Sequence, residues 1–122
     1  MQTSDILLLQ SDPRIADMLM RSLNEQSQRV RLTKSVEDLI HAAAKHQPRA
    51  IVLDLETASL TDIKLLKDQF QGIRIVCNHR IADEEMWTET LGAGADDFCP
   101  SADTRAILHA VVGAPPARAV AA

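Results

Sequence analysis

The chain alternates between short apolar runs and longer segments in which apolar residues recur every three or four positions. The predicted strands are residues 6–9, 30–32, 50–53, 73–77 and 95–99, of which residues 6–9 and 50–53 are continuous apolar runs. Short continuous apolar runs are typical of strands buried on both faces of a parallel sheet, whereas the longer segments have the periodicity of amphipathic helices. Five strand–helix units therefore predict an α/β protein with an open, doubly wound parallel sheet, because right-handed crossovers place helices on both of its faces.

Capping residues mark where the first helix begins. Residues 11–13 read Ser-Asp-Pro, so either Ser11 or Asp12 can cap a helix whose first turn contains the proline. Apolar residues then recur at spacings of three and four, and we expect them to form the buried face of this helix. They are Ile15, Met18, Leu19 and Leu23.

The length and composition fit one globular domain. The chain has 122 residues, 46% of them hydrophobic, which suits a single domain at residues 1–112 and an Ala/Pro-rich tail or linker at residues 113–122. No apolar run approaches the ~20 residues of a membrane span and no secretory signal is visible, so we expect a cytoplasmic protein without membrane contacts. A net charge of -4 and an aromatic content of 2% argue against direct nucleic-acid binding.

The two cysteines give little support to a metal or redox site. Cys77 and Cys99 are far apart in the sequence and no CxxC motif is present. A site built from Asp54, His79 and Cys99 would lack a fourth ligand, so no metal centre is predicted.

Polar residues follow four of the five predicted strands. Gln10 and Ser11 come after the first strand, Asp54 after the third, His79 after the fourth and Ser101 after the fifth. In an open parallel sheet, functional residues gather at the carboxyl ends of the strands. We therefore expect any functional site at this edge.

Three segments resemble the receiver domain of two-component response regulators. They are residues 6–15, residues 51–55 ending around Asp54, and the Ala-Gly-Ala-Asp-Asp-Phe segment at residues 93–98. The resemblance implies a flavodoxin-like (βα)5 domain, a five-stranded parallel sheet in the order 2-1-3-4-5, and a role in signal transduction. It also implies that Asp54 occupies the phosphoacceptor position.

The chemistry of the family is poorly preserved in this chain. In receivers, two acidic residues after the first strand hold Mg²⁺, and here they are replaced by Gln10 and Ser11. The family's Ser or Thr after the fourth strand is replaced by His79, and its Lys after the fifth strand by Ser101. Because Mg²⁺ prefers carboxylate ligands and phosphoryl transfer depends on nearby positive charge, we expect weak or absent Mg²⁺ binding and no other cofactor.

Three functional hypotheses remain open from the sequence. The first is a degenerate receiver, or pseudo-receiver, that acts by protein–protein interaction and has no enzymatic activity. The second is a working response-regulator receiver that is phosphorylated on Asp54 by a histidine kinase. The third is a small doubly wound enzyme or cofactor binder, which is disfavoured because no Gly-rich phosphate loop follows any strand.

Two aromatic residues are candidates for an output surface. Phe98 occupies the position of the family's switch aromatic, and we expect the ring of His79 to hold it in an outward orientation. Trp87 either packs in the core beside Leu91 or belongs to an interface. Receivers use the surface of the fourth helix, fifth strand and fifth helix to bind protein partners or to form homodimers.

Overall fold

The structure of the chain, a computed structural model, describes residues 5–26 and 28–112. The predicted tail at residues 113–122 lies outside the described residues. Strands and helices alternate along the chain: β1 (Asp5–Leu9), α1 (Pro13–Glu25), β2 (Arg29–Thr33), α2 (Val36–His46), β3 (Ala50–Asp54), α3 (Leu60–Gln69), β4 (Arg74–His79), α4 (Glu84–Gly92), β5 (Asp97–Pro100) and α5 (Thr104–Val112).

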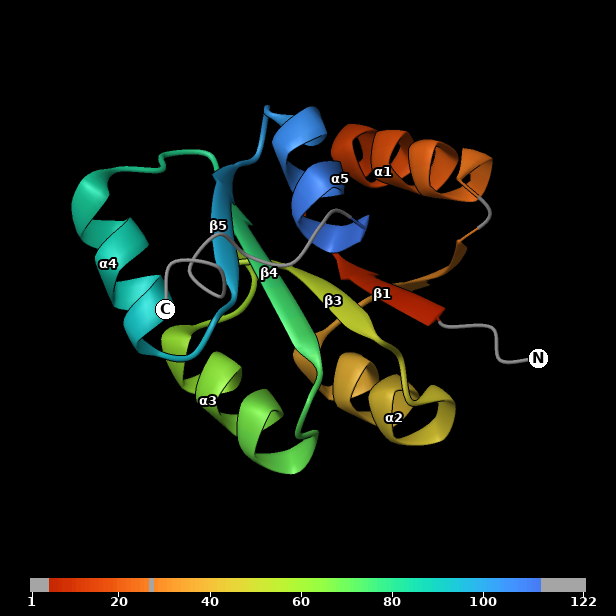
Figure 1. Ribbon diagram of the computed structural model, residues 1–122, viewed down its shortest axis with the longest axis horizontal. Helices are drawn as coiled ribbons and strands as arrows, with labels where there is room; N and C mark the ends of the chain where they lie inside the picture. Colours follow the sequence, from red (N-terminus) through yellow and green to blue (C-terminus); the bar gives the residue numbers. More distant parts are fainter. Residues whose placement is uncertain (1–4, 27, 113–122) are drawn as a thin grey trace.

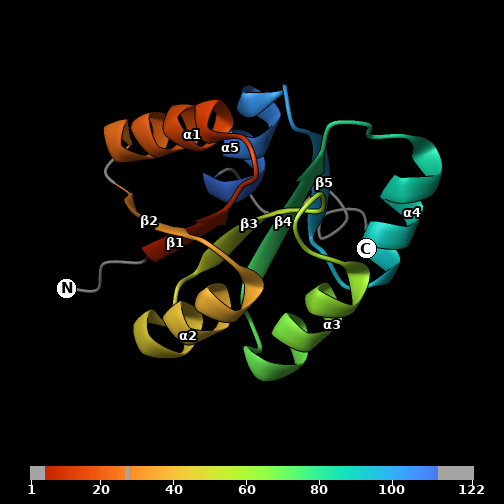
Figure 2. The ribbon, with the colours of Figure 1, turned by 180° about the vertical axis from the view of Figure 1, so that it is seen from behind.

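The strands form one parallel sheet in the order β2-β1-β3-β4-β5, which confirms the predicted flavodoxin-like topology. Helices α1 and α5 cover one face of the sheet and α2, α3 and α4 cover the other (Figures 1 and 2). No helix in the described part of the chain has the length and apolarity needed to cross a lipid bilayer.

Each face of the sheet has its own hydrophobic core, because successive side chains of a strand point to opposite faces. In β1, Leu7 and Leu9 pack toward α2 and α3, whereas Ile6 and Leu8 pack toward α1 and α5. All four are essentially buried. This two-sided burial explains why β1 and β3 contain continuous apolar runs in the sequence.

The buried face of α1 differs from the prediction at Ala16 and Met18, and Ile15 is only partly buried. Leu19 and Leu23 are fully buried, as expected, and the third buried position is Ala16. Met18 is 51% exposed, so its predicted place on the core face is wrong. The helix turns by about 100° per residue, so a face centred on residues 16, 19 and 23 carries residue 18 away from the sheet.

The residue that caps α1 determines whether the Ser11 side chain can bond elsewhere. Asp12 is the N-cap, and its carboxylate accepts a hydrogen bond from the amide of Arg14 at 2.9 Å. Ser11 is therefore not needed as a cap. It lies one residue earlier, at the carboxyl edge of the sheet, where its hydroxyl reaches β3.

Candidate functional site

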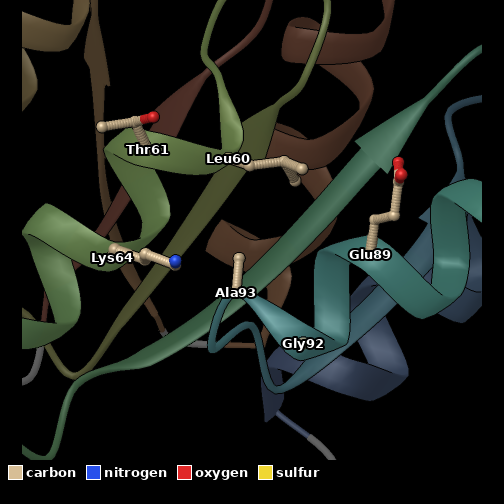
Figure 3. Close-up of a pocket in the computed structure, with 6 residues that line it drawn as sticks. All are labelled: Leu60, Thr61, Lys64, Glu89, Gly92 and Ala93. Carbon is tan, nitrogen blue, oxygen red and sulfur yellow. The ribbon is translucent and has the colours of Figure 1, made fainter.

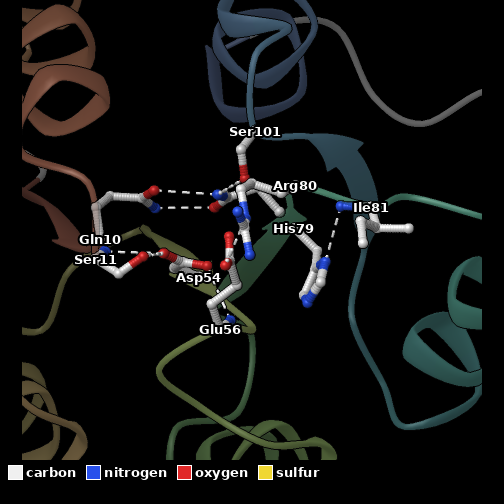
Figure 4. A network of polar contacts seen from close by, with 9 residues as sticks. Gln10, Ser11, Asp54, Glu56, His79, Arg80, Ile81 and Ser101 are labelled. Atoms are coloured by element: carbon white, nitrogen blue, oxygen red, sulfur yellow. Dashed lines mark hydrogen bonds and ion pairs between the residues drawn. The ribbon is translucent and has the colours of Figure 1, made fainter.

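Asp54 ends β3 and is almost completely enclosed, with 2% of its surface exposed. One carboxylate oxygen, Oδ2, accepts hydrogen bonds from the backbone amide of Ser11, at 2.8 Å, and from the Ser11 hydroxyl. The other, Oδ1, accepts a hydrogen bond from the amide of Glu56 at 2.9 Å. Figure 4 shows this arrangement. Uncharged donors of the protein itself thus satisfy both oxygens of the carboxylate.

A second set of hydrogen bonds lies beside Asp54 and joins β1, β4 and the end of β5. The carboxamides of Gln10 and Asn78 form a reciprocal pair: Gln10 Nε2 donates to Asn78 Oδ1 at 2.9 Å, and Asn78 Nδ2 donates to Gln10 Oε1 at 3.1 Å. Asn78 Nδ2 also donates to Ser101 Oγ at 2.8 Å. Asn78 is fully buried and Ser101 is 2% exposed. We call Gln10, Asn78 and Ser101 the amide network.

The structure brings together four of the five predicted strand-end residues: Gln10, Ser11, Asp54 and Ser101. His79 does not join them. Its Nδ1 accepts a hydrogen bond from the amide of Ile81 at 2.9 Å, and its ring lines a depression beside Met86 on the α4 side (Figure 4). The reason is the alternation of side chains in β4, which turns Asn78 and His79 to opposite faces.

Two residues near Asp54, Asn78 and Arg80, had no predicted role. The signal for Asn78 was an amide directly after the buried apolar residues 75–77, since a buried polar side chain needs hydrogen-bond partners. Arg80 forms an ion pair with Glu56 at 2.9 Å, and its side chain is 74% exposed. Arg80 lies in the loop between β4 and α4, and the negative charge of Glu56 balances its positive charge.

The residues at this edge do not fit a Mg²⁺ site of the kind that the receiver resemblance implies. Mg²⁺ needs several oxygen ligands, usually carboxylates. Here Gln10 Oε1 is bonded to Asn78, and the Ser11 hydroxyl donates to the single buried carboxylate of Asp54. Within residues 5–26 and 28–112, no three side chains of His, Cys, Asp or Glu gather closely enough to hold a metal ion.

The predicted outward orientation of Phe98 is wrong. Phe98 is 6% exposed and belongs to the core on the α2, α3 and α4 side of the sheet, together with Cys77 and Ala95. The expectation failed because the imidazole of His79 does not fill the space behind Phe98. It is held by its hydrogen bond to Ile81 and faces the depression beside α4.

Trp87 lies on α4 and is 48% exposed, so it is not a core side chain. The interpretation that it packs in the interior beside Leu91 is therefore wrong. Ile81, in the loop before α4, is 62% exposed. The interface role of Trp87 stays a prediction.

Both cysteines are free and buried, and they lie on opposite faces of the sheet. Burial raises the pKa of Cys77 far above its usual range, and the carboxylate of Asp96 adds to this effect. Burial, followed by the carboxylates of Asp97 and Asp103, raises the pKa of Cys99 to about 12. The fold therefore favours the neutral thiols.

We expect neither thiol to react with a disulfide reagent at pH 8 while the protein is folded, because the thiolate is the reactive form. Both should react at once in denaturant. The contribution of the neutral Cys99 thiol to folding stability is fully present below the ordinary thiol pKa of about 9. It is lost as the pH rises toward the folded-state pKa of about 12. Rapid labelling of the folded protein, followed by absorbance, would contradict this expectation.

Comparisons with known proteins address the fold directly. No protein-family model and no curated protein sequence matches the chain. A solved two-component response regulator from Clostridium difficile is similar with a TM-score of 0.79 and 21% identity, over 88% of this chain and 91% of that one. A response regulator receiver domain protein from Methanospirillum hungatei is similar with a TM-score of 0.77 and 16% identity, over 88% and 90%.

The chain has the fold of a response regulator receiver domain. A response regulator protein from Burkholderia pseudomallei is also similar, with a TM-score of 0.79 and 22% identity. The match covers 98% of this chain and 73% of that one. That structure contains a phosphorylated aspartic acid, a calcium ion and citrate.

Proposed function

We propose that the chain is a receiver-like signal-transduction domain of the pseudo-receiver kind, which acts by protein–protein interaction without Mg²⁺-dependent phosphorylation. The observation that carries this proposal is the closed set of hydrogen bonds around Asp54. The positions expected to hold Mg²⁺ carry Gln10 and Ser11, both bonded to protein groups. The receiver fold supports the signalling part of the proposal.

The chemistry of phosphoryl transfer supports the second part. Attack by Asp54 on a phosphoryl group would concentrate negative charge at this edge, and catalysis rests on positioning and on positive charge placed there in advance. Ser101 has a hydroxyl where a receiver has an ammonium group. The Ser11 hydroxyl and two backbone amides already occupy the Asp54 carboxylate, so a phosphoryl donor would have to displace them.

Acetyl phosphate and beryllofluoride are expected to leave the protein unmodified in the presence of Mg²⁺. Intact-mass spectrometry measures acetyl phosphate modification, and ¹⁹F spectroscopy measures beryllofluoride binding. Asp54→Asn is the control for specificity. Stoichiometric modification of the natural sequence that disappears in Asp54→Asn would overturn the proposal.

A phosphorylatable receiver is the second candidate function, and two observations favour it. Asp54 keeps its place at the end of β3, and Arg80 supplies a cation in the next loop. In this case a histidine kinase would be the phosphoryl donor. The pairing of Arg80 with Glu56 counts against it, because the pair adds no net positive charge.

The proposed output surface consists of α4, β5 and α5, with the exposed Trp87 as its candidate anchor. Aromatic anchors of this kind carry much of the binding energy in protein interfaces. The partner would be another protein or a second copy of the chain. We expect no enzymatic activity and a cytoplasmic location.

Replacing Trp87 with Ala is expected to lower the free energy of unfolding by roughly 1–2 kcal/mol, below the roughly 3–5 kcal/mol typical of a core aromatic. The reason is that Trp87 is already 48% exposed. Urea unfolding followed by circular dichroism measures the difference. A loss as large as that of a core residue would remove Trp87 as an interface candidate.

A further inference from the structure

A groove runs between α3 and α4, on the face of the sheet opposite α1 and α5. It consists of two adjoining depressions of about 310 and 260 Å³, which share Leu60 and Glu89 in their walls. The first depression reaches His79 and Met86, and the second reaches Lys64 and Ala93. Figure 3 shows α3 and α4 as the two walls of the second depression.

The floor and walls of this α3–α4 groove are largely apolar. Leu55, Leu60, Met86 and Ala93 are partly buried and extend the core that lies beneath α2, α3 and α4. The groove stays open because α4 packs mainly against β5. A groove between two helices with an apolar floor is suited to an amphipathic helix of another molecule.

Two opposite charges lie on the two walls of the groove. Glu89 projects from α4 and Lys64 from α3, and both side chains are exposed. Among the ion pairs of residues 5–26 and 28–112, none involves either of them. The carboxylate, at the junction of the two depressions, and the ammonium group, in the second depression, are therefore both available to a bound segment.

The charge of α4 argues against a second copy of the chain as the occupant. Residues 83–93 contain four carboxylates, on Asp83, Glu84, Glu85 and Glu89, and no Lys or Arg. Two α4 helices facing each other would bring these like charges together, which disfavours association. A partner with a basic group beside Glu89 would meet complementary charge.

We propose that the α3–α4 groove binds an amphipathic helix of a partner protein, with a Lys or Arg beside Glu89 and an Asp or Glu beside Lys64. Apolar side chains of this helix fill the space between Leu60, Met86 and Ala93. An acidic first turn and a basic last turn also complement the helix dipole, so the bound helix runs from Lys64 in the second depression toward Glu89. This inference rests on the proposed role as a docking domain, but it assigns a different surface from that of α4, β5 and α5.

A synthetic peptide tests the proposal without knowledge of the natural partner. The probe is a fluorescein-labelled helical peptide of about 14 residues, with leucines along one face, Glu in the first turn, Arg in the last turn and no net charge. A second probe has the Glu and Arg exchanged. Fluorescence anisotropy measures affinity, and amide chemical shifts of the labelled protein locate the binding surface.

We expect the first probe to bind more tightly than the exchanged probe, with shifts confined to residues facing the groove. Glu89→Lys and Lys64→Glu should each weaken its binding by about fivefold or more. Glu84→Lys and Lys45→Glu, which make the same charge changes outside the groove, should leave binding unchanged. The double variant Glu89→Lys/Lys64→Glu should instead prefer the exchanged probe.

The proposal is overturned if neither probe binds at about a millimolar, if both bind equally, or if the shifts map to another surface. Equal weakening by the control variants would mean that the probe binds by general electrostatic attraction, and this result would also overturn the proposal. Dimerisation through the groove, detected by sedimentation, would assign the surface to a second copy. Trp87→Ala and the acetyl phosphate assay test the proposed function separately, because neither result depends on Lys64 or Glu89.

Discussion

The variant Gln10→Asp/Ser11→Asp/Ser101→Lys is expected to take up a phosphoryl group from acetyl phosphate in a Mg²⁺-dependent reaction that the natural sequence does not support. The first two changes place carboxylates beside Asp54, where Mg²⁺ can bind them. The third supplies the missing cation at the end of β5. If these groups are the defect, modification should rise from undetectable to near stoichiometric.

Asn78 determines whether the triple variant can keep its fold. In the natural sequence Asn78 Oδ1 accepts from Gln10, and its Nδ2 donates to Gln10 and Ser101. A carboxylate at position 10 can only accept, and an ammonium group at position 101 can only donate. Asn78 satisfies both after its carboxamide turns over, with Nδ2 toward position 10 and Oδ1 toward position 101.

Mass spectrometry after incubation with acetyl phosphate checks this prediction, with the same triple variant carrying Asp54→Asn as control. A titration of amide shifts should reveal saturable Mg²⁺ binding in the triple variant, whereas the natural sequence should not saturate below about a millimolar. A triple variant that is folded and binds Mg²⁺ but stays unmodified would mean that something other than these groups blocks Asp54. Sub-millimolar Mg²⁺ binding by the natural sequence would contradict the proposed pseudo-receiver.

Replacing Asn78 with Ala is expected to lower the free energy of unfolding by about 2–4 kcal/mol. The side chain is fully buried and takes part in three hydrogen bonds. Its removal leaves the Gln10 carboxamide and the buried Ser101 hydroxyl without their partner, and an unsatisfied buried polar group costs about 1–3 kcal/mol. The remaining loss comes from the cavity.

Thr90→Val is a matched control for Asn78→Ala. Thr90 is fully buried in α4, and its hydroxyl is the one buried side-chain polar atom of residues 5–26 and 28–112 without a hydrogen-bond partner. Because Val has nearly the same shape, the exchange removes a polar group that bonds to nothing. It should be neutral or stabilising, and urea unfolding of both variants measures the contrast. A larger loss for Thr90→Val than for Asn78→Ala would contradict the importance of the amide network.

The fold could be predicted because it depends on features that are local in the sequence. Continuous apolar runs specify strands buried on both faces, and the caps specify where helices begin. The candidate site was predicted only in part, because its contacts depend on which face each side chain takes. Asp54 is paired with Asn78 across β3 and β4, and this pairing brings Asn78 beside Gln10. Neither the Asp54–Asn78 pairing nor the Asn78–Gln10 contact can be predicted from the sequence of one strand alone.

His79 illustrates the same limit. A position at the end of a strand predicts nearness to Asp54, but a shift of one residue along β4 turns a side chain to the other face of the sheet. His79 shares its face with Cys77 and Phe98, whereas Asn78 faces Ser101. The error about Phe98 followed from the assumption that the ring of His79 would fill the space behind it.

Because Cys77 and Cys99 lie in different cores, the opening of each helix layer away from the sheet can be measured separately. Cys77 is covered by the layer of α2, α3 and α4, and Cys99 by the layer of α1 and α5. Exchange of each thiol in the folded protein requires that its own layer part from the sheet, so single-cysteine variants would report the opening free energy of each layer. If a helix partner occupies the α3–α4 groove, it should slow exchange at Cys77 and leave that at Cys99 unchanged.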